Sequence, residues 1–434
     1  MRKLVLCGFL FSLLGGPLFS DAAFSGEATL GVSAYPVLEN DGSKFDSPLN
    51  PANILEFRDL KMNTDLLFKF SSREQKSAFA LWAALKPYDL AQALFAAATD
   101  SADQATAVAD ALTFLGPAPS ALEVLRAYVQ WYAGQAVTIT IGRQSLVTGY
   151  GFGWNPMDFF SSTKEPSDPD RELKGVEALS VQYSAGNLLL LRLAGIYRPQ
   201  PFSSGVDIDQ LQGALQATLS LPSFELKLSG LYKQGSADSE DPYVPAIGAG
   251  FFADLAGVGL YGEAALLKGS RVPLVDTVGL HWQNGWLFSG LLGLQYTFTT
   301  EVSFTFEYFY NGEGYSLAQR RDYEDALDAY NISDGIAPAE YLMLFRPGYF
   351  ARQYLMLNLQ IPVYGISTDI DFTVLFSPDS RALQVLPALT YNFSGGLALE
   401  IVYAGIFSLQ TGQFDEASLS PVRHSMQFSA RYSF

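Results

Sequence analysis

The sequence predicts an all-β fold, a transmembrane antiparallel β-barrel of about 18 strands whose long outer loops carry short helices. Three observations lead to this prediction. The 434 residues are 49% hydrophobic and 14% aromatic but only 16% charged, whereas a soluble domain averages about 25% charged residues. No uncharged apolar run of about 18 residues follows the N-terminus, which excludes a helical membrane protein. Many short segments instead alternate apolar and polar residues, as strands with one apolar face do.

The first 22 residues are predicted to be a cleaved signal peptide. Two basic residues precede a short apolar stretch, and the triplet SDA at 20–22 is a small-residue cleavage pattern. The only cysteine, Cys7, lies inside this peptide, so we expect no disulfide or thiol chemistry in the mature chain. Residues 23–434 are interpreted as a single barrel domain.

The last strand shows the alternation most clearly. In PVRHSMQFSARYSF, apolar and aromatic residues occupy every second position from Met426 to the terminal Phe434, and polar or charged residues occupy the positions between them. In an outer-membrane barrel the apolar phase faces lipid and the polar phase faces a wet lumen. A terminal Phe with aromatic residues third and seventh from the end resembles the C-terminal signature of bacterial outer-membrane barrels. The resemblance implies that the barrel-assembly machinery recognises this strand.

The strand count follows from the alternation of short and long connections, because bacterial barrels have an even strand number, short periplasmic turns and longer outer loops. The segment VDTVGLHWQNGWLF is the one whose assignment as a barrel strand is in doubt. If it were an extra strand, the loop 312–347 would lie in the periplasm. Parity instead assigns it to the sixth outer loop, as a projecting hairpin. The predicted strands lie near 26–35, 61–71, 77–87, 121–132, 136–143, 175–184, 187–197, 209–220, 223–233, 243–253, 256–267, 286–298, 301–311, 348–362, 366–376, 381–393, 396–410 and 422–434. A barrel of about this size encloses an aqueous channel.

Two of the long connections are predicted to be partly helical. Residues 89–115 are alanine-rich with helical spacing, and residues 317–330 are amphipathic. Neither approaches the length of a membrane span. We expect both to cap the mouth of the barrel, with ligand docking as the alternative.

The segment IGRQSLVTGYGFGWNPMDFF, at 141–160, begins the third outer loop, which spans 143–174. Its alternating glycines permit close approach of the backbone to a wall, and Asn155-Pro156 is a turn signal. We therefore predict that this loop folds into the lumen and narrows it. The alternative is an ordinary surface loop with aromatic anchors.

The charges of this loop are candidates for a ring around the pore. They are Arg143, Asp158, Lys164, Glu165, Asp168, Asp170, Arg171 and Glu172. On the wall, alternation turns Glu307, Asp369 and Asp371 inward. Strict alternation would aim Arg143 at lipid, so the strand must end or bulge near Gly142, or Arg143 must extend to the rim.

A family resemblance adds to this interpretation. The pattern GRQ, a glycine-rich turn, WNPMD, and then DPDRELKG looks like the large outer-membrane porins related to the alginate-export channel; SPLNPANI and EYFYNGEGY resemble the same group. The resemblance implies an eighteen-stranded channel with loops folded into the pore. It would place Arg143, Gln144, Trp154, Asn155 and Asp158 near the constriction and Glu307 on the inner wall. An alginate channel would need a positive wall, whereas the inward charges here have both signs.

The expected function is that of an outer-membrane channel for passive passage of small solutes or ions, surrounded by outer-membrane lipid. The alternatives are a closed barrel that binds a partner at the cell surface and a hydrophobic-solute channel of the fatty-acid type, which the NPA at 50–52 weakly resembles. A barrel enzyme is not expected, because the only histidines are His281 and His424 and neither sits in a nucleophile–base pattern. No cofactor or metal motif occurs, and a net charge of −17 disfavours nucleic acid.

Overall fold

The computed structural model describes residues 22–34, 45–50, 60–86, 122–198, 211–233, 245–333, 341, 344–410 and 415–434. The predicted signal peptide falls outside these residues except for Ala22, which begins the first strand. The alanine-rich segment 89–115 also lies outside the described residues.

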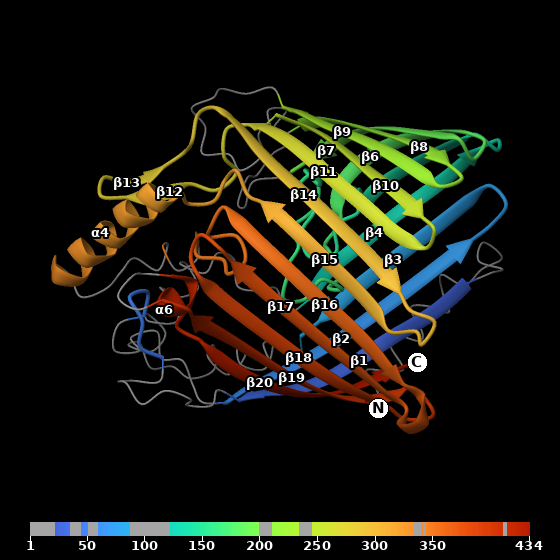
Figure 1. The fold of residues 1–434 in the computed structure, drawn as a ribbon. Helices are drawn as coiled ribbons and strands as arrows, with labels where there is room; N and C mark the ends of the chain where they lie inside the picture. Colours follow the sequence, from blue (N-terminus) through green and yellow to red (C-terminus); the bar gives the residue numbers. More distant parts are fainter. Residues whose placement is uncertain are drawn as a thin grey trace, which may run out of the picture.

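The described residues form a closed antiparallel barrel (Figure 1). Its eighteen strands are Ala22–Ala34 (β1), Leu60–Arg73 (β2), Ser77–Leu85 (β3), Leu122–Ala133 (β4), Val137–Gln144 (β5), Val176–Ala185 (β6), Leu189–Tyr197 (β7), Leu211–Leu221 (β8), Phe224–Lys233 (β9), Ala246–Leu255 (β10), Val258–Lys268 (β11), Trp286–Thr297 (β14), Ser303–Tyr310 (β15), Gln353–Val363 (β16), Thr368–Ser377 (β17), Ala382–Asn392 (β18), Leu397–Ser408 (β19) and His424–Ser433 (β20). The remaining elements are the short strands Leu274–Asp276 (β12) and Gly279–His281 (β13), the helices Leu317–Ser333 (α4) and Glu416–Leu419 (α6), and the 3₁₀ turn Tyr364–Ile366 (η3).

Each barrel strand pairs with its neighbour along the chain, and the first strand pairs with the last. The closing register runs from Glu27 opposite Ser433 to Ala34 opposite Met426. The doubtful segment is a separate two-stranded hairpin, β12–β13, while β11 pairs directly with β14. The predicted fold class and the strand count based on parity are therefore confirmed.

Alternation along the strands separates an apolar outer surface from a polar inner one. On β20, Phe428 and Tyr432 are 45% and 48% exposed on the outside, while Ser429 between them is buried. On β15 the inward Glu307 is fully buried. A charge on the apolar outer face of a membrane barrel costs about 2–4 kcal/mol at mid-membrane and less near the interfaces, which explains why a mid-strand charge such as Glu307 takes the inner phase.

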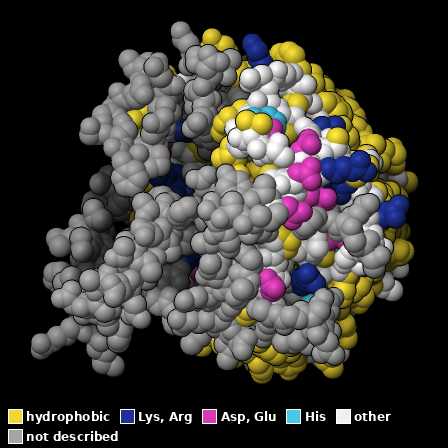
Figure 2. Space-filling view, turned by 90° about the vertical axis from the view of Figure 1, so that its left-hand side faces the viewer, with side chains coloured by type: hydrophobic (Ala, Val, Ile, Leu, Met, Phe, Trp, Pro, Cys, Tyr) yellow, Lys and Arg dark blue, Asp and Glu magenta, His cyan; other side chains and the backbone are white. Residues whose placement is uncertain are grey.

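A second packed region caps the end of the barrel that carries the long connections. Its cluster joins β12, α4, α6 and the chain before β16, and consists of Leu49, Leu274, Val275, Tyr315, Tyr323, Ala326, Leu327, Tyr341, Phe345, Phe350 and Leu419. Helix α4 confirms the helix predicted near 317–330. Figure 2 looks onto this end and shows acidic side chains gathered beside Lys and Arg side chains. Among the described residues, no helix is long and apolar enough to cross a membrane.

The largest error in a predicted boundary is at β16, which was expected from residue 348 and begins at Gln353. Phe350 packs on Tyr315 in the cap cluster, with ring centroids 4.8 Å apart. The backbone N–H of Tyr315 donates to the Phe350 carbonyl at 2.8 Å. These aromatic residues therefore belong to the cap and not to the apolar face of the strand.

Candidate functional site

The connection between β5 and β6, residues 145–175, lies inside the barrel and is called the inner loop below. Inward side chains of the wall contact it from several strands. Gln216 on β8 donates to the Leu146 carbonyl at 2.6 Å, and Ser229 on β9 donates to the Met157 carbonyl at 3.0 Å. These two residues fix the loop at separate points on the inner surface of the wall.

Two glutamates of the wall hold the glycine-rich part of the inner loop. Glu263 on β11 accepts the N–H groups of Tyr150 at 2.5 Å and Gly151 at 2.9 Å through one oxygen, and that of Met157 at 3.3 Å through the other. Glu307 on β15 accepts the N–H of Phe152 at 2.5 Å and that of Gly153 at 2.9 Å. A carboxylate that accepts several N–H groups forms strong charge-assisted hydrogen bonds, so both side chains act as anchors.

The glycines at 149 and 151 make this arrangement possible. Gly149 has φ +122, a conformation that other residues rarely adopt. A Cβ at Gly151 would lie 1.7 Å from the carbonyl oxygen of Trp154. Larger residues at these positions would push the backbone N–H groups away from Glu263.

Trp154 anchors the loop on its other side. Its side chain is fully buried, and its ring stacks on Phe309, with centroids 5.1 Å apart, and packs at a tilt on Tyr354 at 5.8 Å. The indole N–H donates to the Gly348 carbonyl at 3.0 Å. Asn155 begins a turn closed by the Asp158 N–H, which donates to the Asn155 carbonyl at 3.1 Å.

Asp158 is buried within the inner loop and does not face an open passage. Its carboxylate accepts the N–H groups of Phe160 at 3.1 Å and Ser161 at 3.2 Å. Burial raises its pKa to about 6, although these hydrogen bonds and the charge of Arg271 act in the opposite direction. The residues around it pack on the wall in an apolar cluster that includes Leu146, Met157, Phe159, Phe160, Ile196 and Leu267.

The exposed edge of the inner loop, residues 162–171, carries most of its accessible charges. Glu165, Asp168, Asp170 and Arg171 are exposed there. Arg171 pairs with Glu165 at 2.9 Å. Lys164 lies at the start of this edge, and its ammonium donates to the Gly151 carbonyl at 3.0 Å. This edge is the most solvent-accessible part of the loop.

Glu172 connects the far end of the inner loop to the opposite part of the wall. It pairs with Lys69 on β2 at 3.1 Å and with Arg126 on β4 at 3.0 Å. Both cations also lie over the ring of Trp82, with Lys69 Nζ 4.5 Å and the guanidinium carbon of Arg126 3.9 Å from the centroid. The loop therefore spans the lumen, from Glu307 on one side to Lys69 on the other.

The remaining residues expected near a constriction lie elsewhere. Arg143 shares the outward phase with Ile141, which is 60% exposed, and pairs with Glu177 on β6 at 2.7 Å. The strand continues through Gly142 without a register shift, so Arg143 is on the outer face. Gln144 points inward and accepts from Ser180 at 2.6 Å while donating to the Ala178 carbonyl at 2.8 Å.

The two aspartates of β17 lie on the inner wall, but their hydrogen bonds are to wall residues. Asp371 accepts from Asn358 at 3.0 Å and from Thr373 at 3.1 Å. Asp369 accepts from Asn392 at 2.7 Å. Glu307 is the one inner-wall candidate that the structure brings to the loop, as an anchor.

Sequence reasoning missed Glu263 as the second anchor. The signal was a single acidic residue in the inward phase of VGLYGEAALLK, where the other inward residues are Gly, Tyr, Ala and Leu. Tyr261, two residues earlier and in the same phase, donates its hydroxyl to Glu307 at 2.7 Å. The same criterion had identified Glu307.

Comparisons with known proteins place the fold among bacterial outer-membrane porins. No protein-family description matches the chain, and no curated protein matches it. Pseudomonas aeruginosa OccD3 (OpdP) is similar in structure, with a TM-score of 0.51 and 10% identity over 96% of this chain and 92% of that one. Pseudomonas aeruginosa OccK11 (OpdR) has a TM-score of 0.50 and 10% identity over 96% of each chain. At this identity the likeness concerns the fold alone.

Proposed function

We propose that the protein is an outer-membrane channel through which small polar solutes or ions pass passively, and that the inner loop sets the narrowest part of the passage. The porin fold supports the first part of this proposal. A barrel of about this many strands is wide enough to enclose an aqueous channel. The apolar outer face and polar inner face are those expected of a barrel in an outer membrane.

The observation that carries the proposal is the anchoring of residues 145–175 across the lumen. Glu263 and Glu307 hold one part of the loop, and the pairs of Glu172 with Lys69 and Arg126 hold the other. Because the loop is held at both ends, it does not move within the lumen, and the width of the passage beside it stays constant. Its charged exposed edge then acts on solutes at short range, as in a selectivity filter.

The distribution of polar groups favours polar solutes over hydrophobic ones. Several large apolar side chains of the loop, including Met157 and Phe160, are buried against the wall. Charged groups remain along the passage, including the pair of Lys227 with Glu225 at 3.4 Å. An apolar solute would have to displace water from these groups without replacing their hydrogen bonds, which is unfavourable.

Planar-bilayer recording of the purified, heat-modifiable protein tests the proposal. We expect a stable, ohmic conductance. Replacing residues 162–171 by a short Gly-Ser linker should raise it, because the exposed edge is removed while both anchors remain. Shortening the hairpin tip at Val278, which is 95% exposed outside the barrel, is the matched control and should leave the conductance unchanged. A folded protein without conductance would refute the channel and favour a closed, surface-binding barrel.

A further inference from the structure

The outward-facing glycines of the described strands fall into two groups. In the first, an aromatic side chain of the same outer face lies over the space that a Cβ would occupy, with its nearest atom at 2.4–3.0 Å from the ideal Cβ position. This group is Gly26 under Phe434, Gly262 under Phe251, Gly290 under Phe288 and Gly405 under Tyr403. The second group is Gly195, Gly213 and Gly230, where the nearest atoms lie at 3.8–4.0 Å and no aromatic ring covers the position.

The uncovered glycines lie side by side on consecutive strands. Gly195 on β7 is paired with Gly213 on β8, and Gly213 is paired with Tyr232 on β9, two residues beyond Gly230. Glycine inside a strand marks a place where another group approaches the backbone closely. Aromatic residues supply that group at the other outward glycines, so a group from outside the chain is expected here.

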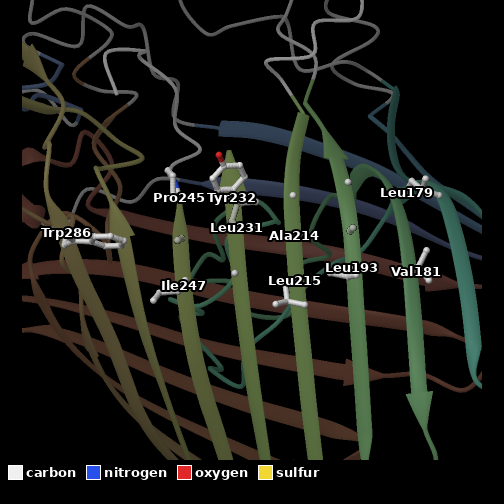
Figure 3. A pocket seen from close by; sticks show the side chains of 15 residues that line it. Leu179, Val181, Leu193, Ala214, Leu215, Leu231, Tyr232, Pro245, Ile247 and Trp286 are labelled. Atoms are coloured by element: carbon white, nitrogen blue, oxygen red, sulfur yellow. The ribbon is translucent and has the colours of Figure 1, made fainter. Parts of the chain in front are cut away.

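The uncovered glycines form the floor of an apolar groove of about 670 Å³ on the outer wall. Figure 3 shows its sides: Leu193, Leu215 and Ile247 along the strands, with Tyr232 and Trp286 nearer the long connections. The volume lies within the range of about 300–1,000 Å³ that binding sites for small molecules occupy. The groove is not part of the lumen, because Leu193 and Leu215 are 62% and 50% exposed on the outer face.

A basic residue adjoins the end of the groove nearest the long connections, next to the lining residues Pro245 and Trp286. Lys268 is exposed in the outward phase of β11, directly opposite Trp286 in the register with β14. Its backbone N–H donates to the carbonyl of Pro245, which lines the groove, at 2.9 Å. Within the described part of the chain, the Lys268 ammonium has no ion-pair partner. An unpaired cation beside Tyr and Trp at a membrane interface suits an anionic headgroup.

We propose that this groove binds a phosphate-bearing anionic lipid of the surrounding leaflet. One acyl chain lies over Gly195, Gly213 and Gly230, and the phosphate lies at Lys268. The inference goes beyond the proposed channel function but rests on the proposed membrane location.

Native mass spectrometry of the detergent-purified barrel tests the proposal. The probe is an equimolar mixture of phosphatidylglycerol and phosphatidylcholine with identical acyl chains. We expect the parent to retain phosphatidylglycerol preferentially. Gly213→Leu places a side chain in the groove, and its Cβ is accommodated because the nearest heavy atom, the Tyr232 carbonyl oxygen, lies 4.0 Å from the Cβ position. The variant should lower retention of both lipids about tenfold by excluding about two methylene groups. Lys268→Gln should abolish only the preference for phosphatidylglycerol.

The matched control is Ala217→Leu, which adds a Leu side chain to the same face of β8 outside the groove and should leave retention unchanged. Equal retention by the parent and Gly213→Leu would overturn the proposal. The proposal would also be overturned if the parent is a dimer and the Gly213→Leu variant is a monomer, because the groove would then be an interface between copies. None of the three substitutions touches the inner loop. Heat modifiability and conductance, measured on the same preparations, therefore test the channel proposal independently of the lipid result.

Discussion

Glu263 and Glu307, on strands β11 and β15, together accept the backbone N–H groups of four consecutive residues of the inner loop, from Tyr150 to Gly153. Neither carboxylate faces an open passage, since Glu263 is 5% exposed and Glu307 is fully buried. Each therefore holds the loop in place and does not itself contact a solute. In the proposed channel, the charges that meet a solute are those of the exposed edge, which the two anchors position.

Replacing Glu307 with Gln should loosen the inner loop. Gln has nearly the same shape as Glu, but its NH₂ group is a hydrogen-bond donor. The groups that Glu307 faces, backbone N–H groups and the Tyr261 hydroxyl, are donors as well, so they lose an acceptor. Each lost hydrogen bond to a charged acceptor is worth about 1.5–3 kcal/mol. We expect faster proteolysis within 145–175 and larger current fluctuations in single-channel records.

The control for this variant is Asp371→Asn, which changes an inner-wall acid whose hydrogen bonds are to Asn358 and Thr373. It should leave the cleavage pattern unchanged. Equal cleavage of the Glu307→Gln protein and the parent would show that the carboxylate does not fix the loop.

Ion selectivity should respond to the exposed edge and not to the buried aspartate. Asp170 is exposed on the edge, whereas Asp158 is buried within the loop. Asp170→Lys should shift the reversal potential toward anion preference at low salt. The shift should shrink in 1 M salt, where the Debye length is about 3 Å.

Asp158→Asn is the matched variant, because it removes a loop charge without changing the exposed edge. Its reversal potential should equal that of the parent. A shift as large as that of Asp170→Lys would place Asp158 in contact with the passing ions and would contradict the assignment.

The pH dependence of stability should carry a contribution from Asp158. Burial raises its pKa from 3.8 to about 6, so the folded protein binds this proton more tightly than the unfolded chain does. The contribution is therefore complete below pH 3.8 and is lost as the pH rises to about 6. Asp158→Asn keeps the oxygen that accepts from Phe160 and cannot ionise.

The difference in free energy of unfolding between Asp158→Asn and the parent should therefore grow with pH, up to about 3 kcal/mol. Heat-modifiability curves of both proteins between pH 3.5 and 8 would measure it. A constant difference over that interval would show that Asp158 titrates at its ordinary value in the folded protein.

Much of the fold was predictable because the outer face tolerates few charges and the strand period is short. In EVSFTFEYFYN, for example, the position of Glu307 alone indicates which face is inward. The hairpin β12–β13 could be separated from the barrel only by parity, since its residues alternate like those of a strand. The start of β16 was misplaced because Phe350 belongs to the cap and its partner Tyr315 is distant in sequence.

The site was less predictable because its contacts join residues far apart in the chain. The glycines and the Asn-Pro turn indicated an unusual loop, but nothing local pairs Gly151 with Glu263 or Trp154 with Gly348. The spacing of residues along this segment also does not show that Asp158 is buried in the turn that its own N–H group closes. Arg143 followed strict alternation, and its partner Glu177 lies opposite it on the next strand.

Orientation in the membrane can be tested with an inserted epitope. An epitope at Asp325, on the exposed face of α4, should be accessible on intact cells, because α4 lies at the end with the long connections. An epitope at Gly186, in the short turn between β6 and β7, should react only after the outer membrane is permeabilised. The reverse result would place the cap in the periplasm and contradict the proposed topology.

The last residue should matter for barrel closure. Phe434 exchanges two backbone hydrogen bonds with Gly26, at 2.9 and 3.0 Å, and its ring lies 6.0 Å from that of Phe24 across the seam between β1 and β20. Deleting Phe434 uncovers Gly26 and removes both hydrogen bonds, and it also removes the terminal aromatic residue that we expect the assembly machinery to recognise. Signal cleavage should be unaffected, while the yield of heat-modifiable barrel in the outer membrane should fall several-fold.

Phe434→Tyr is the control, because it keeps the ring and the backbone and should restore the yield. A normal yield from the deletion would show that neither the seam nor recognition depends on this residue.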